Sequence, residues 1–188
     1  KAYIVYIPSF RGFISTRFTA NPDDWRDHTV FHENMADIKS VEIDFNEDPE
    51  GSFRIDNMGK HQYKLTRLCD NKDLPYDTLK VINLMSSFSD LRFEALFTNT
   101  MEQERIDSIT SSPYVHYLVV TDKDGNKQGM KTFKKLVLNG VTDMGGEYGD
   151  VDHDRMYALI EGGKDFVLIQ NYVFDKVLHD VRYFEAGR

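Results

Sequence analysis

The stretch that most constrains the fold is residues 156–184, near the end of the chain. Residues 156–160 and 165–170 are two short apolar segments on either side of a Glu-Gly-Gly-Lys turn at 161–164. An amphipathic helix is expected to follow at once, because apolar residues recur there at three- and four-residue spacings: Val173, Phe174, Val177, Leu178, Val181 and Phe184. Two strands that run directly into a helix are typical of an α+β fold.

Residues 38–68 carry a second strand signature. Val41, Ile43 and Phe45 alternate with Glu42 and Asp44, which is the period-two pattern of a half-buried strand. The alternation returns at 53–55 and again at 63–68, with a loop at 46–51 and a turn at 57–60. Three antiparallel strands in a meander are therefore expected.

Helical periodicity follows at residues 79–91. Apolar residues there fall at helical spacing, and we expect a helix that starts near Asp73 or Pro75 and ends at Arg92. A brief strand is expected at 93–97. Residues 101–112 then predict a shorter helix with Ile106 and Ile109 facing inward.

The same order of strands and then a helix recurs in the second half. Residues 115–120 and 130–138 predict two strands about a turn at 122–126, followed by a polar loop at 139–154 and the stretch described first. We therefore expect an α+β fold with two related halves of antiparallel strands, each closed by a helix. The units are predicted at 36–112 and 113–188, after an N-terminal strand and connecting arm at 1–35.

The beginning of the chain resembles its last strand in pattern. In both 1–7 and 164–170 a Lys stands two places before an aromatic residue and an aliphatic run. We expect residues 1–7 to be the last strand of a preceding repeat unit, so that further sequence, including a membrane anchor, would precede Lys1.

Composition excludes several classes of function. The net charge of -8 argues against a nucleic-acid footprint, which requires clustered Lys and Arg. The single cysteine, Cys69, excludes an internal disulfide and a cysteine-based metal cluster, and it is expected to be an inert apolar residue. No run of about 18 apolar residues is present, so no membrane-spanning helix is expected in the given sequence.

An acidic, glycine-containing loop is the main candidate for chemistry. Its charged residues surround His153 and are Asp143, Glu147, Asp150, Asp152 and Asp154. Oxygen ligands in a loop suit calcium, with Asp150, Asp152 and Asp154 as candidates, and the cluster is also compatible with acid–base or metal-dependent hydrolysis. The spacing fits no fixed metal loop, however, and favours an ordinary solvated acidic loop.

Other motifs of catalysis or cofactor binding are not found. The sequence lacks a phosphate-binding glycine loop, a Gly-x-Ser-x-Gly elbow and a His-Glu-x-x-His motif, so no cofactor is expected. The segment 122–126 begins like an EF-hand, but its glycine and its twelfth position do not fit, and Asp-Gly between strands indicates a hairpin turn. His28 and His32 have helical spacing, yet the intervening Thr-Val-Phe favours a strand over a zinc pair.

Aromatic and basic residues are interleaved near the N-terminus. The candidate binding residues are Phe10, Arg11, Phe13, Arg17, Trp25 and Arg26. They could meet a membrane surface or an anionic partner. The competing interpretation is that the aromatic side chains pack on their own domain while the arginines stay solvated.

Several phrases of the sequence resemble a known family. They are Trp25–Phe31, Ala36–Ile43, Ala2–Pro8 with Phe10–Gly12, and Met156–Ala158 with Lys164–Gln170 and Phe174–Lys176. Together they resemble bacterial envelope proteins catalogued as domain-of-unknown-function family 4340. The resemblance implies repeated α+β units outside the cytoplasm, an N-terminal membrane anchor and, for some relatives, association with transporters of the gliding-motility ABC type. It implies no catalytic residues.

These observations predict a non-enzymatic binding or accessory module, extracytoplasmic in the bacterial envelope and membrane-tethered in its full-length form. Its partner would be a protein or a glycan, with a transporter complex as one candidate, and no nucleic acid. The alternative is a metal-dependent hydrolase that uses the acidic loop at 143–154.

Overall fold

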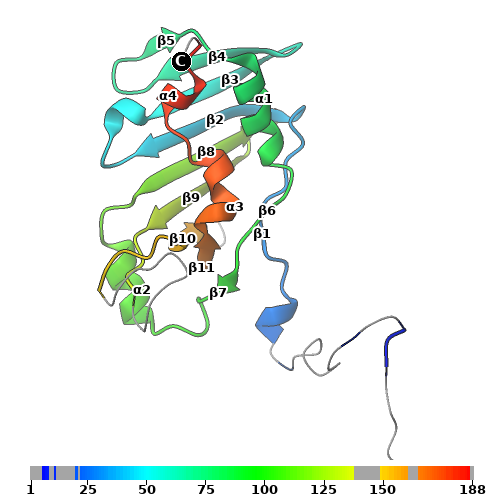
Figure 1. Cartoon of the computed structure of the whole chain (residues 1–188), viewed down its shortest axis with the longest axis vertical. Coiled ribbons are helices and arrows are strands. Elements are labelled where there is room, and N and C mark those ends of the chain that lie inside the picture. Colours follow the sequence, from blue (N-terminus) through cyan, green and yellow to red (C-terminus); the bar gives the residue numbers. More distant parts are fainter. Residues whose placement is uncertain are drawn as a thin grey trace, which may run out of the picture.

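In the described part of the chain, nine strands form one antiparallel sheet (Figure 1). The computed structural model describes residues 6–8, 11, 20, 22–137, 149–160 and 165–186. In spatial order the strands of the sheet are β5 (Lys72–Leu74), β4 (Gln62–Arg67), β3 (Phe53–Gly59), β2 (Ile38–Phe45), β8 (His116–Asp122), β9 (Lys127–Phe133), β10 (Arg155–Ile160), β11 (Asp165–Gln170) and β7 (Ala95–Leu96). A separate two-stranded pair joins β1 (Thr29–Phe31) to β6 (Leu91–Arg92).

Short helices complete the fold. They are α1 (Thr78–Ser87), α2 (Gln103–Thr110), α3 (Asn171–Phe174) and α4 (Val181–Phe184), with 3-10 turns η2 (Pro22–Trp25), η3 (Pro49–Gly51) and η4 (Asp175–Val177). The α+β class and the expected meander of β2, β3 and β4 are thereby confirmed. β2 also pairs with β8 along its length, so the sheet continues across the predicted unit boundary at 112/113.

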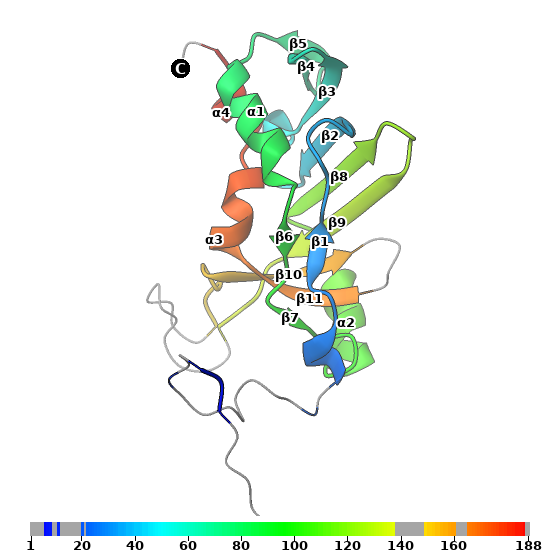
Figure 2. The ribbon, with the colours of Figure 1, turned by 90° about the vertical axis from the view of Figure 1, so that its right-hand side faces the viewer.

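The main core lies between the sheet and the helices α1, α3 and α4, which cover one of its faces (Figures 1 and 2). The period-two positions Val41, Ile43, Phe53 and Ile55 point into this layer and are fully buried. The helices contribute apolar residues from their inner sides, including Val81 of α1. Alternation along the strands therefore sets which face becomes the core.

A smaller core lies on the other face of the sheet. Its buried residues are Ile106, Phe133, Tyr157, Phe166 and Leu168, and Ile109 packs against them. Along β10 and β11 these residues alternate with main-core residues such as Ala158 and Val167, so they point to the opposite side. The helix α2 covers this end of the sheet, which confirms the inward positions predicted for Ile106 and Ile109.

The predicted continuous C-terminal helix is wrong. The segment divides into α3, η4 and α4, with an interruption before Asp180. The Asp180 side chain accepts a hydrogen bond from the Arg182 amide at 2.9 Å and so begins a new helix, because aspartate is favoured at N-caps and disfavoured inside helices. The apolar stripe was nevertheless predicted correctly, since Phe174, Val177, Val181 and Phe184 are fully buried.

The first helix is also shorter than predicted. Asp77 caps α1 by accepting hydrogen bonds from the amides of Leu79 and Lys80. The residues before the cap form β5 instead of helix, and Leu91 and Arg92 form β6. Similarly, β9 begins and ends earlier than the predicted 130–138, and the strand expected at 93–97 is reduced to Ala95–Leu96.

Two hairpin turns differ in how well they were predicted. The turn expected at 57–60 lies at Lys60–His61, and both residues have positive φ, at 52° and 58°. The turn at 122–126 is confirmed, because the Asp122 amide donates to the Asn126 carbonyl and Gly125 has a φ of 89°.

No helix within the described residues is long and apolar enough to cross a membrane. Of the strand predicted at the start of the chain, residues 1–5 lie outside the described residues. Tyr6 and Ile7 are exposed and belong to no strand.

Candidate functional site

A cleft of about 430 Å³ opens where β11 leaves the sheet and turns into α3. Arg155 at the start of β10 pairs with Gln170 at the end of β11, so the segment before β10 and the first turn of α3 form adjacent walls. The residues that line the cleft are His153, Asp154, Arg155, Gln170, Asn171, Tyr172 and Asp175. Two sequence segments that are close only in the folded chain thus build the site.

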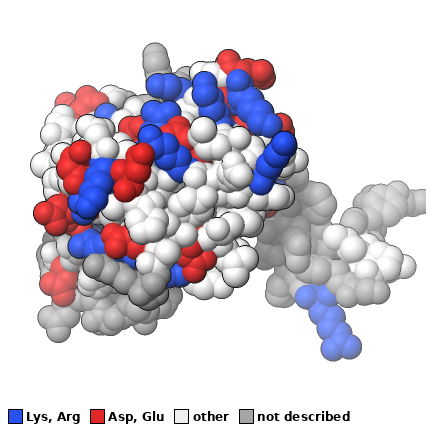
Figure 3. All heavy atoms as spheres, turned by 90° about the horizontal axis from the view of Figure 1, so that it is seen from above, with Lys and Arg blue, Asp and Glu red and all other residues white. Residues whose placement is uncertain are grey.

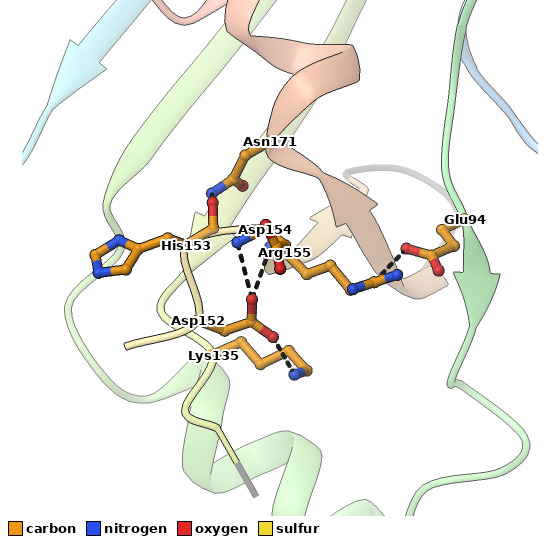
Figure 4. Close-up of polar contacts among 7 residues, drawn as sticks. All are labelled: Glu94, Lys135, Asp152, His153, Asp154, Arg155 and Asn171. Atoms are coloured by element: carbon orange, nitrogen blue, oxygen red, sulfur yellow. Dashed lines mark hydrogen bonds and ion pairs between the residues drawn. The ribbon is translucent and has the colours of Figure 1, made fainter. Parts of the chain in front are cut away.

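Asp152 anchors the wall before β10 (Figure 4). Its side chain is buried and lies 2.5 Å from the Lys135 ammonium, and it accepts hydrogen bonds from the Asp154 and Arg155 amides at 2.9 and 3.1 Å. Burial alone raises the pKa of the Asp152 carboxyl, but the hydrogen bonds from Lys135 and from these amides outweigh burial and hold the pKa below its usual value. Asp152 is therefore a charged structural anchor of the cleft.

Asn171 and Arg155 fix the geometry of the two walls. The Asn171 amide donates to the Asp154 carbonyl at 2.8 Å, and its side-chain Nδ2 donates to the His153 carbonyl at 2.7 Å. Arg155 Nε donates to Glu94 Oε2 at 2.8 Å, which ties the start of β10 to the segment before β7 (Figure 4). These contacts hold the backbone of the cleft in place independently of any ligand.

Two buried oxygens of the cleft residues lack protein donors. Asp154 Oδ2 and Asn171 Oδ1 are buried, and neither accepts a hydrogen bond from a described residue. A buried acceptor without a donor costs about 1–3 kcal/mol. These two acceptors of the cleft residues therefore have no donor among the described residues.

The remaining lining groups are open to solvent. Tyr172 is 91% exposed, although it lies in a segment whose other aromatic and aliphatic residues are largely covered. Asp175 is exposed, and the His153 ring points away from the other labelled side chains in Figure 4. Among the described residues no hydrogen bond joins His153 to a carboxylate, so these residues do not form an assembled acid–base pair.

The structure separates the described residues of the predicted acidic loop. Asp143 and Glu147 lie outside the described residues, Asp150 is exposed, and Asp152 is engaged by Lys135. Of the described residues of this loop, His153 and Asp154 line the cleft, where Asp175 of η4 joins them. Within the described part of the chain no group of three or more His, Cys, Asp or Glu is placed to hold a metal ion.

The other residues singled out from the sequence lie elsewhere. The His28 ring stacks on Phe93 at 4.5 Å, whereas His32 lines a second hollow near the end of α1. Cys69, expected to be an inert apolar residue, is a free thiol and is exposed.

The N-terminal aromatic and basic residues are only partly described. Phe10, Phe13 and Arg17 lie outside the described residues, and Arg11 is exposed. Trp25 is 63% exposed rather than packed in the core. Arg26 forms an ion pair with Asp165 at 3.1 Å, which joins the arm to the start of β11. The structure does not bring these described residues to the cleft lining.

Surface charge is mixed on the end of the molecule that Figure 3 shows. Lys and Arg gather toward one side of this face, and Asp and Glu lie beside and among them. The cleft combines an exposed ring with carboxylates and buried acceptors, and it is therefore the better candidate.

Sequence reasoning missed five of the described cleft residues: Arg155, Gln170, Asn171, Tyr172 and Asp175. The available signal was Tyr172, a large aromatic residue that lies off the apolar stripe of the predicted helix. This signal is weak in the sequence alone, because single apolar residues are common on protein surfaces.

Comparison with known proteins gives no match to a family model, to a curated protein or to a solved structure. The family resemblance noted in the sequence therefore stays a prediction. Function has to be argued from the cleft and from the sequence phrases themselves.

Proposed function

We propose that the chain is a non-enzymatic binding or accessory module of the bacterial cell envelope, with the cleft beside α3 as its ligand site. In its full-length form the protein would be extracytoplasmic and membrane-tethered, and its partner a protein or glycan, with an envelope transporter complex as the candidate implied by the family resemblance. The cleft carries the binding part of the proposal, because its walls are fixed while Tyr172 and Asp175 remain exposed. The envelope location is supported only by the sequence segments that resemble family 4340.

Binding is favoured over the metal-dependent hydrolase for an electrostatic reason. A hydrolytic metal site would need several carboxylates from the 143–154 loop at one place. Among its described members, Asp152 is already neutralised by Lys135, and only Asp154 contributes a carboxylate to the cleft lining. An ion-paired carboxylate is a poor candidate for a metal ligand or a general base.

We also propose that the chain consists of two related halves. The order of the strands in the sheet supports this. The sheet runs β5-β4-β3-β2 and then β8-β9-β10-β11, so each half contributes four strands in sequence order outward from the β2–β8 pair. Each outward run is followed by helix, α1 after β5 and α3 after β11, and both helices cover the same face (Figure 2). Such an arrangement is what a duplicated strand–helix unit would produce by pairing its first strands.

A capture experiment tests the binding function. The chain, its Tyr172→Ala variant and a Leu79→Ala control are immobilised and exposed to a detergent-solubilised bacterial envelope fraction and to a glycan array. Leu79 lies on α1, is 72% exposed and does not line the cleft, so it controls for loss of an exposed apolar side chain. We expect at least one protein or glycan to be retained by the wild type and the control and lost by Tyr172→Ala. Identical retention by all three proteins would contradict the proposal.

Location is tested separately with the full-length protein. A C-terminally tagged form should sediment with membranes and become protease-sensitive when the outer envelope is opened. Recovery in the soluble cytoplasmic fraction would overturn the envelope assignment while leaving the cleft argument intact.

A further inference from the structure

The charged groups of the described cleft lining are unbalanced toward negative charge. Among the described lining residues, Asp154 and Asp175 bring two carboxylates, whereas Arg155 is the one formally charged cation and is paired with Glu94. Asn171 uses its Nδ2 to hold the His153 carbonyl, which leaves its Oδ1 as a buried acceptor beside the cleft. A ligand that fits this surface should supply hydrogen-bond donors and positive charge.

Tyr172 adds a preference for a cationic ligand at the mouth of the cleft. Its ring is 91% exposed, so its face is available to a ligand. Asp175 follows three residues later in the continuous turn from α3 into η4, which places both side chains on the same side of that turn. A cation above a tyrosine face is attracted by the ring quadrupole, and an adjacent carboxylate strengthens the same preference.

We propose that the cleft binds the guanidinium or ammonium group of an arginine or lysine side chain presented by a partner protein. The inference rests on the proposed binding function and names the chemistry of its ligand. The net charge of -8 favours the same class of partner, because an acidic protein attracts basic surfaces over the distance of the encounter.

A glycan is the competing occupant. An exposed tyrosine with amide and carboxylate neighbours can also hold a sugar ring by stacking and by hydroxyl donors. A neutral sugar would leave the charges of Asp154 and Asp175 uncompensated, whereas a cationic side chain would neutralise charge and satisfy acceptors together. The charge of the cleft therefore favours the cation, and a sugar is an outcome that the test must detect.

The test compares three probes by NMR titration of the isotope-labelled chain. They are Nα-acetyl-arginine amide, the neutral isostere Nα-acetyl-citrulline amide and di-N-acetylchitobiose. We expect the arginine probe to shift the backbone resonances of 153–155 and 170–175 and to bind about tenfold more tightly than the citrulline probe. Raising the salt from about 50 mM to about 500 mM should weaken the arginine probe, because the interaction depends on charge.

Matched variants locate the interaction. Asp175→Asn and Tyr172→Ala should each weaken the arginine probe several-fold. Asp124→Asn removes the same charge at an exposed turn outside the cleft and should leave the affinity unchanged. Thermal unfolding of each variant shows that the fold is kept, and the exposure of Asp175 and Tyr172 makes both changes compatible with folding.

Several results would overturn the inference. They are equal binding of the citrulline probe, binding of chitobiose in place of the arginine probe, or no shift of the cleft resonances by arginine. If Tyr172→Ala abolishes capture while the arginine probe fails to bind, the binding function stands and the cationic ligand is wrong. If capture is unaffected by Tyr172→Ala, the binding function itself fails.

Discussion

At the scale of single residues, Asp152 shows how a charge can organise a site without taking part in binding. It is the charged side chain that the described part of the chain buries, and it bridges Lys135 to the backbone before β10. We expect Asp152→Asn to lower the free energy of unfolding by about 3 kcal/mol, because it leaves the Lys135 charge without its partner in a largely buried position. Urea unfolding followed by circular dichroism measures the change.

An exposed ion pair provides the control for Asp152. Asp90 pairs with Arg92 at 2.7 Å, and both side chains are more than half exposed. Asp90→Asn should change the free energy of unfolding by less than about 0.5 kcal/mol. Equal losses for the two variants would show that Asp152 contributes no more than a surface charge.

His116 predicts a stability change in mild acid. Burial lowers its pKa to about 4, and its Nδ1 lies 2.9 Å from Thr132 Oγ1. Since the folded-state pKa lies below the ordinary value of 6.5, the unfolded chain binds more protons between pH 6.5 and 4. The contribution of neutral, buried His116 to the free energy of unfolding is therefore fully present above pH 6.5. It is lost as the pH falls from 6.5 to 4, with a slope that approaches about 1.4 kcal/mol per pH unit.

The titration of His116 is tested by unfolding at a series of pH values. His116→Gln keeps a hydrogen-bonding side chain but removes the titrating group, so its stability should vary less over this interval. An unchanged slope in His116→Gln would assign the acid sensitivity to other groups.

Residue-level features of the site were the hardest to predict. The sequence shows Asp150, Asp152 and Asp154 as equivalent members of an alternating run. Only the fold brings Lys135, seventeen positions before Asp152, into contact with one of them. Tyr172 and Asp175 were missed because their importance depends on β11 ending beside the segment before β10. Long-range packing of this kind leaves no local pattern.

At the scale of secondary-structure elements, the β3–β4 hairpin carries a local strain. Its two-residue loop places Lys60 and His61 at positive φ, which is the geometry of a type I′ turn and is favoured by Asn-Gly. Replacing the pair by Lys60→Asn with His61→Gly should raise the free energy of unfolding by about 1 kcal/mol, because left-handed backbone costs less for these residues. Thermal or urea unfolding provides the measurement.

The β8–β9 hairpin supplies a comparison for the turn substitution. Asp124 is exposed, and its φ is not positive, unlike that of the adjacent Gly125. Asp124→Gly should therefore leave stability unchanged or slightly lower it, since glycine adds freedom to the unfolded chain without relieving strain. A similar gain in both turns would argue against strain at Lys60 and His61.

Elements were predicted well where hydrophobic periodicity is strong. The alternation at Val41 and Ile43 correctly predicted β2 and its buried face, and the stripe through Phe174 and Phe184 correctly predicted which C-terminal residues are buried. The break in that helix was missed because the apolar spacing continues across it. A cap such as Asp180 competes with periodicity, and the packing of α4 on α1 decides between them.

At the scale of the whole molecule, the proposed halves are interlocked rather than separate. The main core contains buried residues from both halves, for example Val41 of β2 and Ile169 of β11. The C-terminal helix α4 follows the strands of the second half but packs over the first. The Asp77 amide donates to the Phe184 carbonyl at 2.8 Å, and the Phe184 ring lies 5.0 Å from Phe53 of β3. Because the two halves share one core and α4 packs across them, we expect a single cooperative unfolding transition.

Phe184→Ala tests this coupling. Phe184 is fully buried, and its removal should lower the free energy of unfolding by about 3–5 kcal/mol through lost burial and the cavity left behind. Because the core is shared, the midpoint should shift equally for Val41 in the first half and Val167 in the second, as followed by NMR-detected urea unfolding. Tyr172→Ala truncates a 91% exposed aromatic side chain of the same C-terminal segment and should change stability by less than about 0.5 kcal/mol. Separate midpoints for Val41 and Val167 would mean that the two halves unfold independently and that α4 stabilises only the residues next to it.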